Sequence, residues 1–249
     1  MRDSPAVSNQ EPATRPMQAI PSIKVWDLPT RIFHWLLAIL ILLQYGTAEW
    51  HWLSMQWHVW FGYATLALLL FRVTWGFVGS QTSRFADFVA APHRALAYAR
   101  DLVSNKTRLD IGHKPGHNPG HNPLGGWSVL AMLACLLVQT ITGLFSSNHR
   151  HTEFGPWAAR IPEQWVRRLT EIHQINQNVL LILIGVHIAV VLAYWIGRDE
   201  NLVGPMLHGR KPLAPMAPLR FASLRRAFGV VALAAFVVWV IVAAAGIGA

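Results

Sequence analysis

Five apolar stretches, each long enough to cross a lipid bilayer, constrain the fold of this chain more than any other feature. They run from about 32–48, 57–78, 127–145, 172–196 and 228–248. A helix needs about 20 predominantly apolar residues to cross the roughly 30 Å hydrocarbon core, and it satisfies its own backbone hydrogen bonds there. Only 13% of the 249 residues are charged, whereas about 25% is usual in soluble domains. We therefore expect an all-α integral membrane protein.

The positive charges between these stretches predict how the chain crosses the membrane. Sixteen Lys and Arg residues lie in the N-terminal tail and in the loops after the second and fourth stretches. The loop after the third stretch has four, and the loop after the first stretch and the C-terminus have none. Cytoplasmic loops carry the excess of positive charge, so we expect a cytoplasmic N-terminus and a periplasmic C-terminus. The same placement explains the net charge of +9 and leaves no basic face for nucleic acid.

The segments around the stretches divide the chain into three parts. Residues 1–24 are polar, contain proline and lack the apolar core of a signal peptide, so they predict a disordered cytoplasmic tail. Residues 25–212 hold the first four stretches, and residues 213–249 hold a linker and the fifth. The single cysteine, Cys135, excludes both an intrachain disulfide and a haem attached through a C-x-x-C-H motif.

Four histidines lie in or at the ends of the apolar stretches, where an imidazole is rarely kept without a partner. His173 and His187 are fourteen residues apart in the fourth stretch, so a helix places both on one face, about 21 Å apart. In the predicted orientation His34 lies towards the cytoplasm and His58 towards the periplasm. The four histidines therefore form two pairs at matched depth: His34 with His187 near the cytoplasm, and His58 with His173 near the periplasm.

Two imidazoles that face each other across a helical bundle are typical axial ligands of a six-coordinate haem. We therefore predict two non-covalent, bis-histidine haem b groups stacked across the bilayer. One alternative is that each histidine is a satisfied core residue. Another is a zinc or copper site, but those metals favour three or four ligands close together, often with cysteine or carboxylate. Iron with both axial positions filled favours electron transfer over oxygen binding.

Further residues are candidates for contact with a haem. Arg72, within the second stretch, and Arg31, one turn before His34, are candidates for binding propionates. Arg72 alternatively extends to lipid headgroups. Glycines in or beside the stretches would let a porphyrin approach a helix, or would serve ordinary helix packing; they are Gly46, Gly62, Gly76, Gly143 and Gly185.

A histidine-bearing loop lies between the second and third stretches. It contains the repeat GHNPGHNP at 116–123, whose glycines and Asn-Pro pairs predict a turn-rich segment. Its histidines are His113, His117 and His121. We interpret them as loop polar groups in preference to metal ligands, because proline and glycine do not provide a rigid element.

Five motifs resemble the bacterial membrane b-type cytochromes that include cytochrome b561 and the cytochrome b subunits of nickel–iron hydrogenases. They are VWDLPTRIFHW at 25–35, WHVWFGYATLALLLFRVTWGFVGSQTSRFADF at 57–88, GHNPLGGWS at 120–128, EIHQINQNVLLILIGVHIAVVL at 171–192 and DENLVGPMLHGRKP at 199–212. The resemblance covers roughly residues 23–212. It implies a four-helix transmembrane haem-binding bundle in the bacterial inner membrane, to which the fifth stretch is an addition. The implied haem ligands are His34, His58, His173 and His187.

The resemblance also implies a function and its partners. Such proteins pass electrons between a quinone pool and a hydrogenase, a c-type cytochrome or another periplasmic redox protein, and the resemblance is compatible with a homodimer. A stand-alone haem-dependent oxidoreductase, acting between quinone and superoxide or a metal ion, is an alternative. A histidine-using transporter or proton channel would need polar residues along a path through the membrane, and these are sparse here. We assign no catalytic residue and no quinone site.

Overall fold

A computed structural model of the chain describes residues 21–103, 120–148, 153–198, 200–213 and 217–246. It confirms the predicted class, because it contains helices long and apolar enough to cross a membrane. Within the described residues there are five of these: α1 (Leu28–Ala48), α2 (Met55–Val78), α5 (Pro123–Gly143), α6 (Glu163–Arg198) and α8 (Leu224–Ala244). The chain is therefore a multi-pass membrane protein.

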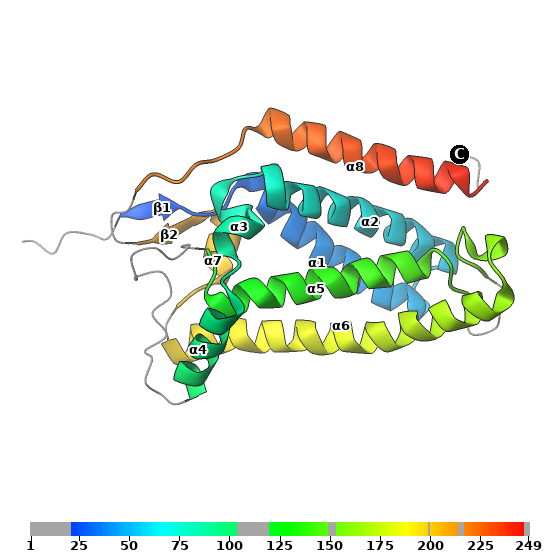
Figure 1. The fold of residues 1–249 in the computed structure, drawn as a ribbon, viewed down its shortest axis with the longest axis horizontal. Coiled ribbons are helices and arrows are strands. Elements are labelled where there is room, and N and C mark those ends of the chain that lie inside the picture. The colour runs from blue at the N-terminus through cyan, green and yellow to red at the C-terminus, as the bar shows by residue number, and fades with distance from the viewer. Residues whose placement is uncertain (1–20, 104–119, 149–152, 199, 214–216, 247–249) are drawn as a thin grey trace, which may run out of the picture.

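The helices pack as two adjacent pairs with one added helix. α1 packs along α2, α5 packs along α6, and the contact of α2 with α5 joins the pairs. α8 lies along the outer side of α2 (Figure 1). The core between them is built from Phe33, Leu69, Phe71, Trp75, Leu133, Leu136 and Leu180, together with Ala227, Val230 and Ala234 of α8. Among the described helices, α6 packs closely only along α5, so its sides towards α1 and α2 are left for other contacts.

Polar capping residues explain why three of these helices begin four residues before the apolar stretches. The carboxylate of Asp27 accepts a hydrogen bond from the backbone N–H of Thr30 (2.8 Å) at the start of α1. The side chain of Asn122 accepts one from Gly125 at the start of α5 (2.6 Å). Ser223 caps α8 in the same way. Such caps satisfy backbone donors that the first helical turn leaves free, and they lie outside the hydrophobic pattern.

The fourth crossing helix is much longer than its apolar stretch. α6 begins at Glu163, nine residues before the predicted start at 172, and its 36 residues extend for about 54 Å. Its first turns are polar and include an ion pair between Glu163 and Arg167, which are both exposed. The apolar pattern marks the part of a helix that lies in lipid, so this projecting part was not recognisable as helix from hydropathy.

Short elements gather at the end of the bundle where α1 begins (Figure 1). They are the 3-10 turn η1 (Gln81–Ser83), α3 (Phe85–Phe88), α4 (Pro92–Val103), α7 (Val203–His208) and the strands β1 (Ser22–Lys24) and β2 (Arg210–Pro212). The strands pair antiparallel, with Ile23 opposite Lys211. The expectation that disorder extends to residue 24 is therefore wrong for residues 22–24, because β2 supplies their backbone partners.

The turn between α7 and β2 requires glycine. Gly209 has φ +83°, and a Cβ there would lie 2.8 Å from the carbonyl oxygen of Trp26. Its own carbonyl accepts hydrogen bonds from the backbone N–H groups of Val25 (2.8 Å) and Trp26 (3.1 Å). This close approach joins the segment before α1 to the segment after α6. At the other end, the α5–α6 connection contains the 3-10 turn η2 (Ala158–Arg160).

Candidate functional site

The four intramembrane histidines lie in two pairs in the structure. His34 of α1 faces His187 of α6, with ring centroids 6.4 Å apart. His58 of α2 faces His173 of α6, with ring centroids 6.5 Å apart. These partners are the ones that matched depth predicts. α6 therefore contributes one histidine to each pair, on the sides that it turns towards α1 and α2.

The spacing within each pair fits one metal ion between two imidazoles. A ring nitrogen binds a transition metal at about 2 Å, and the ring centroid lies roughly 1 Å farther out, so two coaxial ligands have centroids about 6 Å apart. Within the described residues, no group of three or more His, Cys, Asp or Glu side chains could hold a metal ion. Each pair is thus a two-ligand site, which suits a planar cofactor that supplies the remaining ligands.

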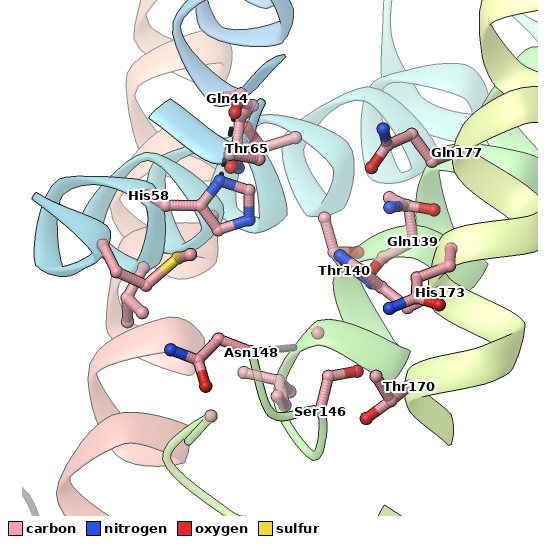
Figure 2. A pocket seen from close by; sticks show the side chains of 18 of the residues that line it. Gln44, His58, Thr65, Gln139, Thr140, Ser146, Asn148, Thr170, His173 and Gln177 are labelled. Atoms are coloured by element: carbon pink, nitrogen blue, oxygen red, sulfur yellow. Dashed lines mark hydrogen bonds between the residues drawn. The ribbon is translucent and has the colours of Figure 1, made fainter. Parts of the chain in front are cut away.

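The His58–His173 pair opens into a pocket of about 420 Å³. Figure 2 shows the two rings facing this pocket from α2 and α6. Leu136, Leu180 and Leu181 line its apolar part. Polar lining residues include Glu49, which accepts a hydrogen bond from the side-chain amide of Gln177 (2.8 Å). An apolar slot with a polar margin suits a large, mostly apolar cofactor.

The imidazole of His58 is held by α1. Its Nδ1 lies 3.1 Å from the carbonyl oxygen of Gln44, a contact drawn in Figure 2, and 3.2 Å from Oγ1 of Thr47. A carbonyl can only accept, so Nδ1 carries the proton and donates it. Nε2 of His58 then carries the lone pair that a metal ligand requires, with the side-chain amide of Gln44 lying 3.3 Å from it.

α5 holds His173 in the same way. Nδ1 of His173 lies 3.0 Å from the carbonyl oxygen of Gln139 and 3.1 Å from Oγ1 of Thr142. A Cβ at Gly143 would lie 3.1 Å from Cε1 of His173, so the missing side chain lets the ring approach α5. The side chain of Gln139 also accepts a hydrogen bond from Asn176 (2.6 Å), which joins α5 to α6 beside His173.

Sequence reasoning missed these supporting residues. Both helices carry the pattern Gln-x-x-Thr, at 44–47 and at 139–142, near the ends of α1 and α5. That repeat is the only signal that pointed to them. It is weak on its own, because threonines in membrane helices commonly bond to their own backbone.

The His34–His187 pair has different surroundings. Nδ1 of His34 is buried and has no hydrogen-bond partner among the described residues. Its ring meets the ring of Trp35 edge-on at 5.0 Å. Among the described residues, His187 also forms no hydrogen bond through its ring. The two pairs therefore have similar ring spacing but differ in the hydrogen bonds that hold their rings.

His121 lies against the end of the bundle that holds the His34–His187 pair. Its ring packs on the rings of Trp26 (4.9 Å) and Phe88 (4.5 Å), and its Nδ1 is buried with no described partner. Burial, and then the positive charge of Arg72, lower the pKa of His121 to about 3, so the ring is neutral near pH 7. The expectation of a loop polar group is wrong for His121, because its half-buried ring packs against two aromatic rings. His113 and His117 lie outside the described residues.

The two candidate propionate ligands lie at this same end. Arg72 is 3% exposed, and its guanidinium donates to the carbonyl of Ser83 (3.2 Å) beside the ring of Phe85. Arg72 therefore points into the protein and does not extend to lipid headgroups. Arg31 donates through Nη1 to the carbonyl of Leu207, and its Nε is buried with no partner among the described residues.

The five glycines in or beside the apolar stretches have different surroundings. A Cβ at Gly46 or Gly76 would lie 2.1 Å from an aromatic ring, of Trp52 and Phe85 respectively, so these glycines serve close packing. Gly62 and Gly143 line the pocket of the His58–His173 pair. Gly185 has open space around its Cβ position. Only Gly62 and Gly143 are thus placed, among the five, where a cofactor in that pocket would approach.

Comparison with known proteins agrees with this geometry. The family model described as prokaryotic cytochrome b561 matches residues 25–209, which include all four paired histidines. A search of curated proteins gave no significant match. The matched segment ends at α7, so α8 lies outside it.

Proposed function

The chain belongs to the prokaryotic cytochrome b561 family and is a membrane b-type cytochrome that transfers electrons through haem, and we propose that it holds two haem groups. The proposed axial ligands are His34 with His187 and His58 with His173. The observation that carries this proposal is the pair of ring spacings, 6.4 and 6.5 Å, each of which fits one iron between two imidazoles.

The chain's own residues would hold and orient each cofactor. Gln44 and Gln139 fix the rings of His58 and His173 through their backbone carbonyls. Arg31 and Arg72 are proposed to bind the propionates at the His34–His187 pair, because both are cationic and lie at that end of the bundle. A haem bound at each pair would supply one-electron transfer, and the two histidines of that pair would hold it.

The separation of the pairs supports transfer across the membrane. His173 and His187 lie on one continuous helix, α6, about 21 Å apart along its axis, so the two sites are stacked between the faces of the bilayer. Loop charge supports a cytoplasmic N-terminus, and with that orientation the His34–His187 pair would lie on the cytoplasmic side. We propose a quinone pool as one redox partner and a hydrogenase, c-type cytochrome or other periplasmic redox protein as the other.

Haem content tests the ligand pairing directly. Purified protein is expected to contain two haem b per chain by pyridine haemochrome assay. His187→Ala and His34→Ala should each leave one, and the double variant should also leave one. His34→Ala combined with His58→Ala should leave none, because it disrupts both pairs. The control His93→Ala, at an exposed position in α4, should keep both. Two haems per chain in His187→Ala would contradict the pairing.

A further inference from the structure

We propose that Thr47 and Thr142 are positioning residues that lower the reduction potential of the haem at the His58–His173 pair relative to the other haem. This inference rests on the proposed function, because it takes the two pairs as axial ligands. It concerns the hydrogen-bond partners of the ligands, which differ between the two sites. Neither threonine would contact the iron, so each would act through its histidine.

The hydroxyl groups of the two threonines have the same geometry. Oγ1 of Thr47 donates within its own helix to the carbonyls of Leu43 (2.8 Å) and Gln44 (2.9 Å). Because its one proton is directed at these carbonyls, its lone pairs remain to accept from Nδ1–H of His58 at 3.2 Å. The hydroxyl is therefore an acceptor towards the ligand histidine.

Thr142 repeats this arrangement on α5. Its Oγ1 donates to the carbonyls of Val138 (2.7 Å) and Gln139 (3.2 Å) and accepts from Nδ1–H of His173 at 3.1 Å. Thr47 is 2% exposed and Thr142 is 5% exposed. Hydrogen bonds in such dry surroundings are electrostatically stronger than those in water. Each ligand of this pair thus has two buried acceptors, a carbonyl and a hydroxyl, at Nδ1.

The other pair lacks this support. Nδ1 of His34 has no acceptor within the described part of the chain, and His187 makes no ring hydrogen bond there. The difference therefore affects both ligands of each site. It arises from helix packing, because α1 carries the acceptors for the histidine of α2, and α5 carries the acceptors for one histidine of α6.

The chemical consequence follows from ligand basicity. A hydrogen bond from Nδ1–H to an acceptor raises the basicity of the imidazole and orients its ring. A more basic ligand stabilises the ferric form more than the ferrous form, because the ferric centre carries more positive charge. The contribution of the ligands should therefore give the haem at the His58–His173 pair the lower reduction potential. Each lost acceptor should raise that potential.

Potentiometric titration of the full-length protein tests the proposal. The component that is absent from His58→Ala belongs to the His58–His173 pair. In Thr142→Val, and separately in Thr47→Val, that component should shift to higher potential while the other stays unchanged. A tenfold loss of ferric preference would correspond to about 59 mV for one electron, and we expect a shift up to this size.

Two further variants separate tuning from a general structural effect. Thr142→Ser keeps the hydroxyl and should retain the wild-type potential. Thr140→Val is the matched control: Thr140 also lines the pocket, but among the described residues its Oγ1 bonds to the carbonyls of Leu136 (3.0 Å) and Leu137 (3.2 Å) on its own helix and not to a histidine. It should move neither component.

Two results would overturn the inference. One is a protein with two haems in which neither Thr142→Val nor Thr47→Val shifts the assigned component. The other is an equal shift of both components, or the same shift in Thr140→Val. Either result would leave the ligand pairing standing, since haem content of the histidine variants tests that separately. A preparation without two haems would instead refute the proposed function.

Discussion

Replacing Asp27 with alanine is expected to destabilise the end of the bundle where α1 begins. The carboxylate of Asp27 is 3% exposed and has two partners. Oδ1 accepts from the backbone N–H of Thr30 at 2.8 Å, and Oδ2 accepts from Nε1 of Trp75 at 3.0 Å. Trp75 is fully buried, so alanine at position 27 would leave its indole N–H without a partner.

The structure sets the size of this effect. Loss of the helix cap costs about 1 kcal/mol, and an unsatisfied buried donor costs roughly 1–3 kcal/mol. Asp27→Ala should therefore lower the free energy of unfolding by about 2–4 kcal/mol. In a Trp75→Phe background the donor is absent, so the same change should cost less by roughly 1–3 kcal/mol, while the cap and the attraction of Asp27 for the buried guanidinium of Arg72 are still lost.

Reversible unfolding with sodium dodecyl sulfate in mixed micelles, followed by circular dichroism, measures this coupling. Asp27→Asn is the matched variant, because its carbonyl oxygen keeps the cap while its amide cannot accept from Trp75. It should fall between wild type and Asp27→Ala. His34 lies seven residues after Asp27, two turns along α1, so its haem component should also be less stably bound. An equal cost of Asp27→Ala in both backgrounds would refute the reasoning.

Two other predictions concern the site and the topology. Gly143→Val should lower the occupancy of the haem at the His58–His173 pair, because the added side chain meets the ring of His173. Gly185→Val, at an open position, should keep both haems. Equal haem loss in the two variants would contradict the close approach of His173 to α5. Alkaline phosphatase fused after residue 53, in the α1–α2 turn, should be active and a fusion after residue 90 inactive, and the reverse pattern would refute the cytoplasmic N-terminus.

The sequence by itself determined the membrane class and the pairing of the histidines by depth. Both depend on properties that are local to a segment. Twenty apolar residues must cross a bilayer as a helix, and the fourteen-residue separation of His173 and His187 puts both on one helical face whatever packs against it. Their opposing partners, His34 and His58, followed from segment direction alone.

The tertiary structure alone decided what surrounds each histidine. Acceptors for His58 and His173 come from Thr47 and Thr142 on neighbouring helices, and the rotation of one helix against another cannot be read from hydropathy. Long-range packing also turned Arg72 inward and placed His121 against two aromatic rings. Local chemistry thus predicted which histidines form pairs, whereas contacts between distant segments determine how their rings are held.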